Sequence, residues 1–306
     1  FIGRNAALYF AKKSDFLVFG TYFNSDPFEH EKVKMLHVDL TNKKDVDKVI
    51  KGMDIVLQAA GVTSGVKDIA EKPHTFISDN AVMNSLILRS AFDNKVSHMI
   101  LLSCTVMYQS SNVPLKETDF NANLEMYPAY FGGGWNKVYF EKMCEFYSRL
   151  GKVKFTALRH SNIYGPYDKF DLQRAHVFGA TVNKVFNSNS GELTIWGSGE
   201  EKRDLLYISD LMTAIEAAIK NQKKIYDIFN IGIGKAIAIK DLVQKIINIS
   251  GKQLEIDFDL SKPSNKTSLC LDCSKAFKEI KWNPKIEIDE GILKTIKWYR
   301  KNFNGK

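Results

Sequence analysis

The first half of the chain alternates short apolar runs with longer amphipathic stretches, and this rhythm limits the fold more than any other feature. Residues 99–102 and 155–158 are apolar or nearly so, whereas residues 75–94 carry their apolar side chains at helical spacing. Strands that alternate with helices form βαβ units and a parallel sheet. The sequence therefore predicts an α/β fold, with a doubly wound, Rossmann-type parallel sheet in its first part.

The second half is less regular and predicts a smaller α/β lobe. Gly, Asn, Ser, Asp and Pro gather around residues 164–171, 187–201 and 260–266. We expect a dinucleotide-binding domain over residues 1–160, to which the chain returns at about 205–230. Residues 161–204 and 231–306 are then expected to form a substrate lobe, with ligands bound between the two parts at the carboxyl ends of the strands.

The composition narrows the class of ligand. The net charge of +8 comes mainly from lysines spread over the whole chain, which has only seven arginines. Nucleic-acid surfaces cluster their cations and favour arginine, so a small anionic ligand such as a nucleotide is the better prediction. We expect no membrane span, no metal site and a cytoplasmic location, because the apolar runs are short and four scattered cysteines suit a reducing compartment.

The N-terminal residues have the pattern of the end of a dinucleotide-binding loop. Gly3 stands directly before a predicted helix, where glycine lets backbone N–H groups approach a pyrophosphate. Asp39 ends a later strand with a carboxylate placed for an adenine amino group. Because the chain starts on this glycine, we expect a first strand and most of the loop, about a dozen residues, to precede Phe1. The expected cofactor contacts are Gly3, Arg4, Asp39, Leu40, Ala59, Ala60, Gly61, Lys137 and His176.

The choice of cofactor follows from the second predicted strand. Residues 20–25 contain no carboxylate that could hold the ribose hydroxyls of NAD, and Arg4 supplies a cation beside the glycine. NADP enzymes avoid the acid and supply such a cation. The sequence favours NADP and leaves NAD possible.

Residues 162–176 read N-I-Y-G-P-Y-D-K-F-D-L-Q-R-A-H, and W-G-S-G from 196, R-D-L-L-Y from 203 and F-N-I-G from 229 follow. With these motifs the chain resembles the extended short-chain dehydrogenase/reductases, the NAD-dependent epimerase/dehydratase family, and within it the GDP-L-fucose synthase branch. The resemblance implies 3,5-epimerisation and NADPH-dependent 4-keto reduction of a GDP-4-keto-6-deoxyhexose, by a homodimer joined through the helices near 75–94 and 135–150. Alternatives remain: another nucleotide-sugar 4-epimerase or dehydratase, or a binding protein without reductase activity.

The resemblance also implies a Tyr-x-x-x-Lys pair, in which the ammonium lowers the tyrosine pKa. Lys137 aligns with the family's lysine, but the tyrosine position is Gly133. Tyr130 lies seven residues before Lys137, about 10 Å away along a regular helix. The three glycines at 132–134 are expected to break the helix, so that the Tyr130 hydroxyl either turns back into the site or is structural.

Cys104 occupies the strand position that carries Ser or Thr in the family, whose own cysteine aligns with Val106. Residues 104 and 106 face the same side of a strand, roughly 6.6 Å apart, so Cys104 is either an acid or base of the site or a small buried thiol. Thr105 offers a neighbouring hydroxyl. His176, which ends the long motif, is expected near the cofactor and opposite Cys104, moving a proton at a sugar carbon.

Further residues are expected to hold the substrate. Lys184 and Arg203 are the predicted diphosphate ligands, because cations, and Arg with its fork above all, bind such groups. The full predicted set is Asn162, Lys184, Trp196, Arg203 and Lys262.

Overall fold

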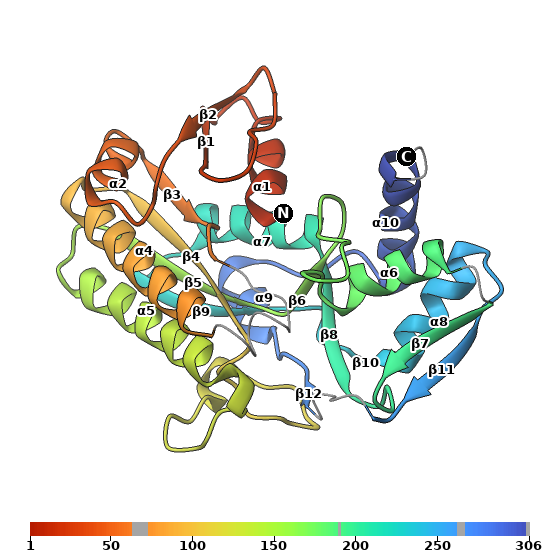
Figure 1. Ribbon diagram of the computed structural model, residues 1–306. Coiled ribbons are helices and arrows are strands. Elements are labelled where there is room, and N and C mark those ends of the chain that lie inside the picture. The colour runs from red at the N-terminus through yellow and green to blue at the C-terminus, as the bar shows by residue number, and fades with distance from the viewer. Residues whose placement is uncertain (63–72, 189–190, 262–266, 304–306) are drawn as a thin grey trace.

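The computed structural model describes residues 1–62, 73–188, 191–261 and 267–303. Figure 1 shows two lobes, the first holding the N-terminal half of the chain together with segments that return to it later, and the second holding most of the remaining chain. The predicted α/β class with a doubly wound parallel sheet and a smaller α/β lobe is confirmed.

The first lobe is built on parallel strands. One sheet has the order β3-β4-β5-β9, and β1 pairs with β2 in a second one. The strands are β1 (Val18–Tyr22), β2 (Val33–His37), β3 (Ile55–Gln58), β4 (His98–Cys104), β5 (Lys154–His160) and β9 (Tyr226–Ile231). β9 comes from far along the chain and lies beside β5, so the polypeptide returns to this lobe after leaving it.

Helices cover both faces of the four-stranded sheet (Figure 1). On one face lie α2 (Lys43–Ile50), α4 (Pro73–Asp93) and α5 (Phe131–Arg149), which pack on Met99 and Leu101 of β4. On the other lie α1 (Ile2–Phe10) and α7 (Ile208–Asn221), over Ile100 and Leu102. Successive strand residues point to opposite faces, which is why an unbroken apolar run such as 99–102 is needed when both faces are buried.

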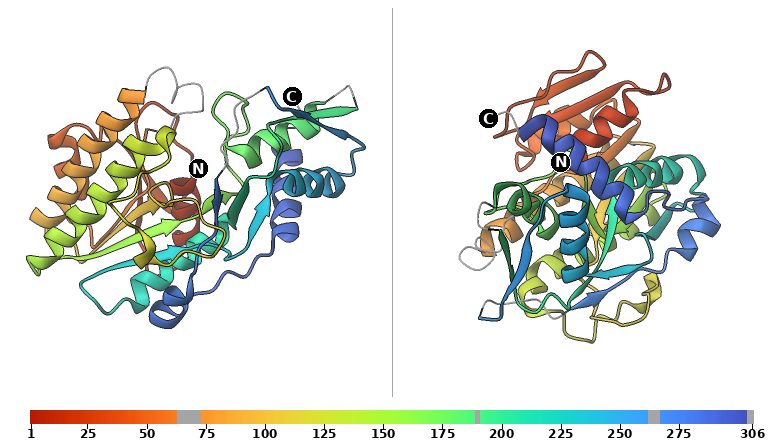
Figure 2. Two further views of the ribbon diagram at one scale, coloured as in Figure 1. Left: turned by 90° about the horizontal axis from the view of Figure 1, so that it is seen from below. Right: turned by 90° about the vertical axis from the view of Figure 1, so that its right-hand side faces the viewer.

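The second lobe combines short strands with three long helices (Figure 2). β8 (Lys202–Tyr207) pairs with β6 (Asn162–Tyr164), β10 (Ala236–Ala238) and β12 (Ser268–Leu269), and β7 (Glu192–Trp196) pairs with β11 (Glu255–Asp259). The helices are α6 (Val177–Asn187), α8 (Ile239–Ser250) and α10 (Ile288–Phe303). The shorter α9 (Ser274–Ile280) packs on α7 and β9 of the first lobe.

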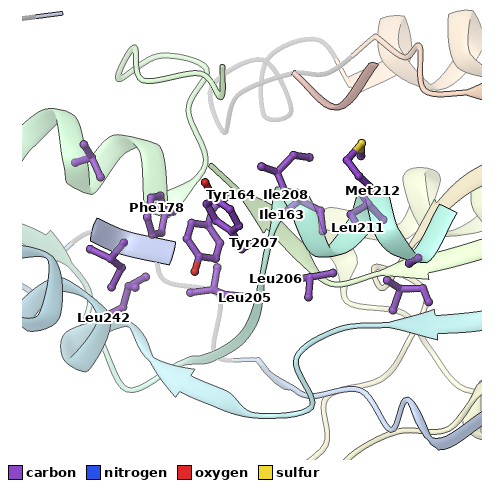
Figure 3. Close-up of a cluster of buried hydrophobic side chains, with 14 of the residues drawn as sticks. Ile163, Tyr164, Phe178, Leu205, Leu206, Tyr207, Ile208, Leu211, Met212 and Leu242 are labelled. Carbon is purple, nitrogen blue, oxygen red and sulfur yellow. The ribbon is translucent and has the colours of Figure 1, made fainter. Parts of the chain in front are cut away.

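A shared apolar core joins the lobes. β8 runs directly into α7, and Figure 3 shows the side chains of both elements in one buried cluster with those of α6 and α8. Within it the Tyr164 ring lies 4.2 Å from that of Phe178 and 5.6 Å from that of Tyr207, measured between centroids. The second lobe is therefore fixed to the sheet through packed side chains.

The predicted break of the helix at residues 132–134 is wrong, because all three glycines lie inside α5. A Cβ on Gly132 would lie 2.7 Å from Ile77 Cδ1 of α4, and one on Gly134 would overlap Met126 Sδ. These two glycines serve close packing and not a turn. Tyr130 belongs to the short helix η2 (Pro128–Tyr130) and is the residue just before α5. Whether its hydroxyl reaches the site or is structural stays a prediction.

Candidate active site

The carboxyl end of β4 brings two predicted catalytic residues to one place. Lys137 projects from α5, and its ammonium donates a hydrogen bond of 2.8 Å to the carbonyl oxygen of Leu102. Cys104 follows two residues later as the last residue of β4, and its thiol is free and half-buried. Thr105 lies in the turn that follows, where its carbonyl oxygen accepts from the Tyr108 amide at 3.0 Å.

His160 lies beside Cys104, and the sequence did not single it out. The two residues are register partners on the parallel strands β4 and β5, so their side chains share a face of the sheet. One ring nitrogen, Nδ1, lies 2.8 Å from the Ser161 carbonyl oxygen, which makes it the protonated nitrogen and leaves Nε2 to accept. The available signal was its position at the end of a strand, two residues before the Asn162 motif.

The pKa of His160 links it to two other residues of the site. Burial is the main cause that lowers this pKa to about 4, and the positive charges of Lys137 and His176 act in the same direction. Both charges are therefore within electrostatic reach of the imidazole. At neutral pH the ring is neutral, with a lone pair on Nε2.

His176 is the residue just before α6, and solvent reaches its side chain. The surrounding chain still lowers its pKa, first by removing water from around the ring and second through the charge of Lys169. The structure thus places Cys104 and His160 side by side at the ends of β4 and β5, with the Lys137 ammonium bonded to β4 two residues before Cys104. His176 stands at the start of α6, and its charge acts on His160.

Gly133 is the position where the family's tyrosine would stand. Among the residues that the structure describes, a Cβ there would meet only Phe76 Cε2, at 3.9 Å, an ordinary contact. Tyr130 instead packs its ring against Tyr127, with 5.6 Å between centroids.

Several of the predicted cofactor residues lie together where α1 begins and β3 ends. A Cβ on Gly3 would lie 3.7 Å from that of Ala59, so the start of α1 and the end of β3 are neighbours. Ala60 and Gly61 are exposed beside them, and such small residues leave backbone groups open to a bound pyrophosphate. Leu40 packs partly into the core under α2 and α4.

Asp39 and Arg4 are each held by local partners. The Asp39 carboxylate accepts from the amide and hydroxyl of Thr41, at 2.9 and 2.7 Å, and the hydroxyl bond above all lowers its pKa. The Arg4 guanidinium lies over the rings of Phe28 and Tyr167, 5.0 and 4.1 Å from their centroids. Stacking leaves the in-plane donors of an arginine available for a phosphate.

The predicted substrate residues lie in the second lobe. Lys184 Nζ donates to the Thr194 carbonyl oxygen at 2.9 Å, and burial lowers the pKa of this lysine. Arg203 donates to the Thr267 carbonyl oxygen at 2.5 Å. Asn162 Nδ2 lies 3.4 Å from the Asp204 carbonyl oxygen, and Trp196 at the end of β7 is 49% exposed. Lys262 lies outside the described residues.

The surface recesses of the molecule lie away from these residues. Within the described residues no three His, Cys, Asp or Glu side chains come together as metal ligands. Two surface recesses of about 560 and 430 Å³ lie elsewhere, beside Glu192 and Gln244 and beside Cys273 and Phe277. Neither contains a predicted site residue, so the site is defined by its side-chain chemistry.

The chain is similar to several known proteins. The chain is 28% identical over 273 residues to a GDP-L-fucose synthase of Azorhizobium caulinodans, covering 86% of this chain and 85% of that protein. It is 27% identical to a GDP-L-colitose synthase of Yersinia pseudotuberculosis, covering 87% and 88%. The crystal structure of UDP-glucose 4-epimerase from Thermotoga maritima superimposes with a TM-score of 0.86, at 22% identity over 98% and 96% of the two chains. Residues 1–232 match the model of one family, and the chain therefore belongs to the NAD dependent epimerase/dehydratase family.

Proposed function

We propose that this chain is a nucleotide-sugar epimerase/reductase acting on a GDP-4-keto-6-deoxyhexose. The observation that carries the proposal is the pairing of Cys104 with His160 at the carboxyl ends of adjacent parallel strands, where the Lys137 ammonium also reaches β4. Ligands of doubly wound folds bind at this edge. Two relatives, named for GDP-L-fucose and GDP-L-colitose, favour a GDP-linked sugar.

The proposed roles follow from the chemistry of each group. A carbon next to a ketone is acidic enough for Cys104 and His176 to remove and return its proton, one from each side of the sugar ring. Lys137 contributes a positive charge beside the reacting carbonyl and a donor for the cofactor ribose. NADPH, when bound, supplies the hydride that reduces the C4 ketone. His160, neutral and accepting through Nε2, is suited to hold a sugar hydroxyl.

The cofactor residues support NADP over NAD. Arg4 stacks on two rings near the start of α1 and presents donors suited to a phosphate. The predicted residues Gly3, Ala59, Ala60 and Gly61 would face the pyrophosphate. NADPH and NADH assayed in parallel decide between the two, and NADPH is expected to be the better reductant.

Gly133 favours a second candidate function, in which reduction is slow or lost. A site with Cys104 and His176 but no tyrosine can still exchange protons next to the ketone. It lacks the usual proton donor to the new alkoxide. A 4-epimerase or dehydratase remains the third candidate, since the superimposed Thermotoga structure is a 4-epimerase, a likeness that shows the fold alone.

One experiment separates these functions. The protein is incubated in D₂O with GDP-4-keto-6-deoxymannose and NADPH, and NMR follows deuterium at C3 and C5 together with reduction at C4. Exchange with reduction supports the epimerase/reductase, and exchange alone supports the epimerase without its reductase half. Tight cofactor binding without either reaction would leave a binding protein.

We also propose a homodimer built on α4 and α5. Large side chains are exposed along these helices, namely Val82, Phe131, Trp135, Tyr139, Phe146 and Leu150. Such a row is unusual on a monomer and suits a helix-to-helix interface. The predicted cytoplasmic location stays a prediction. In the described part of the chain, no helix combines the length and apolarity that crossing a bilayer requires.

A further inference from the structure

A row of buried polar side chains lies immediately before the candidate catalytic row of the sheet. In register across three strands the polar row is Ser103 on β4, Arg159 on β5 and Asn230 on β9. The following row is Cys104, His160 and Ile231. Because successive strand residues alternate faces, the polar row points toward α5 while the candidate catalytic row points the other way.

A buried ion pair ties this row to α5. The Arg159 guanidinium donates two hydrogen bonds to the Glu141 carboxylate, Nη2 to Oε2 at 2.7 Å and Nε to Oε1 at 2.9 Å. Each side chain is only 4% exposed. The Ser103 hydroxyl donates to Glu141 Oε1 at 2.6 Å, so one carboxylate holds both β4 and β5.

Tyr108 extends the network into the turn after Cys104. Its hydroxyl accepts from Arg159 Nη1 at 2.8 Å and donates to Asn230 Oδ1, also at 2.8 Å. Arg159 Nη1 donates as well to the Glu117 carbonyl oxygen at 3.0 Å. The turn that carries Thr105 is thereby fixed at both ends, by the end of β4 and by the Tyr108 side chain.

Stability alone does not account for such a pair. Removing two charges from water costs several kcal/mol, and apolar side chains of the same volume often stabilise a fold as well. The network does provide a defined position of α5 relative to β4. Lys137 and Glu141 are one turn apart on α5, and they bond to consecutive residues of β4, Leu102 and Ser103.

We propose that four residues, Glu141, Arg159, Ser103 and Tyr108, are positioning residues for the site. Together they fix the position of α5 along β4, and this places Lys137 beside Cys104. These four residues touch no reacting atom in this account. The catalytic purpose of placing Lys137 there rests on the proposed function. The position of Lys137 itself can be measured without cofactor or substrate.

The test uses two variants that each remove one hydroxyl and no charge. In Ser103→Ala the carboxylate of Glu141 keeps both bonds from Arg159, and in Tyr108→Phe Arg159 keeps its bonds to Glu141 and Glu117, so both proteins are expected to fold. Thr295→Val is the matched control, because it removes a fully buried hydroxyl that donates 2.8 Å to Gly291 O on α10, in the other lobe.

The readouts are the acetylation rate of Lys137, measured by competitive labelling and mass spectrometry, and the alkylation rate of Cys104. Loss of one buried hydrogen bond changes a local equilibrium about fivefold, and we expect the Lys137 rate to rise by about that factor in both variants and to stay at the wild-type value in the control. A wild-type Lys137 rate in either variant, or an equal rise in Thr295→Val, would overturn the proposal. An inactive enzyme with the expected labelling pattern would instead count against the proposed function alone.

Discussion

Gly133 is the residue on which the reductase half of the function depends. Its backbone is helical, a Cβ there meets only Phe76 Cε2 of the described part of the chain, at 3.9 Å, and a side chain at this position lies one turn before Lys137. Gly133→Tyr is therefore expected to place a phenol near the ammonium and to raise the rate of NADPH oxidation by about 100-fold, the usual contribution of a general acid.

Gly133→Phe is the control for this substitution, since it adds the same ring without the hydroxyl. Steady-state rates with GDP-4-keto-6-deoxymannose compare the two variants. Equal rates in Gly133→Tyr and Gly133→Phe would show that the missing hydroxyl is not what limits reduction.

His98 predicts how stability depends on pH. Its Nε2 lies 2.7 Å from Thr156 Oγ1, which in turn donates to Gln222 Oε1, so the imidazole donates and is neutral. Burial, and then the charge of Lys154, lower the pKa of His98 to about 4. Between pH 6.5 and 4 the unfolded chain binds a proton that the folded chain does not, so stability falls as the pH falls.

Over the range from pH 7 to pH 5 this linkage costs about 2 kcal/mol of the free energy of unfolding. Urea unfolding of the wild type and of His98→Gln at both pH values measures it. In His98→Gln the free energy of unfolding is expected to change less between pH 7 and pH 5, by about that amount. This holds whatever the substitution does to stability at pH 7. An unchanged slope would mean that other groups carry the acid sensitivity.

At the scale of the element, the glycines of α5 differ in what they do. Gly133 has open space, so Gly133→Ala is expected to stabilise the protein by about 0.5 kcal/mol through helix propensity. Gly134→Ala overlaps Met126 Sδ and is expected to cost about 1–3 kcal/mol. Denaturant midpoints of the two variants measure the difference, and a stabilised Gly134→Ala protein would contradict the packing account.

Much of the element order could be predicted from the sequence, because both faces of β4 and β5 need continuous apolar runs and the helices between them show their own period. The helical state of residues 132–134 could not be predicted. Two of the glycines leave room for Ile77 and Met126, which approach from other segments. Helix propensity is judged from neighbouring residues in the sequence and takes no account of such contacts.

The residues of the candidate site were also predictable only in part. Cys104 and Lys137 were proposed through their alignment with the resembled family; Cys104 ends β4, and Lys137 reaches the same strand from α5. His160 was missed because its importance comes from its register beside Cys104. Pairing between strands more than fifty residues apart in sequence is set by the whole sheet, which no local pattern records.

At the scale of the whole molecule, the exposed row on α4 and α5 predicts a dimer. Phe146 on α5 is 54% exposed, and Phe146→Glu places a charge in the proposed interface. Sedimentation velocity is expected to show a dimer for the wild type and a monomer for this variant. Phe277→Glu on α9 is the control, since Phe277 is equally exposed at 54% and lies away from these helices. A wild-type monomer would contradict the proposed assembly.

Deuterium exchange into GDP-4-keto-6-deoxymannose tests the central claim most directly, with the wild type and His176→Asn compared in D₂O by NMR. A site in which Cys104 and His176 move protons next to the ketone predicts deuterium at C3 and C5 with the wild type, and a loss of about 100-fold or more in the exchange rate at one carbon or both in the variant. Wild-type exchange no faster than in buffer, or an unchanged rate in His176→Asn, would contradict the account.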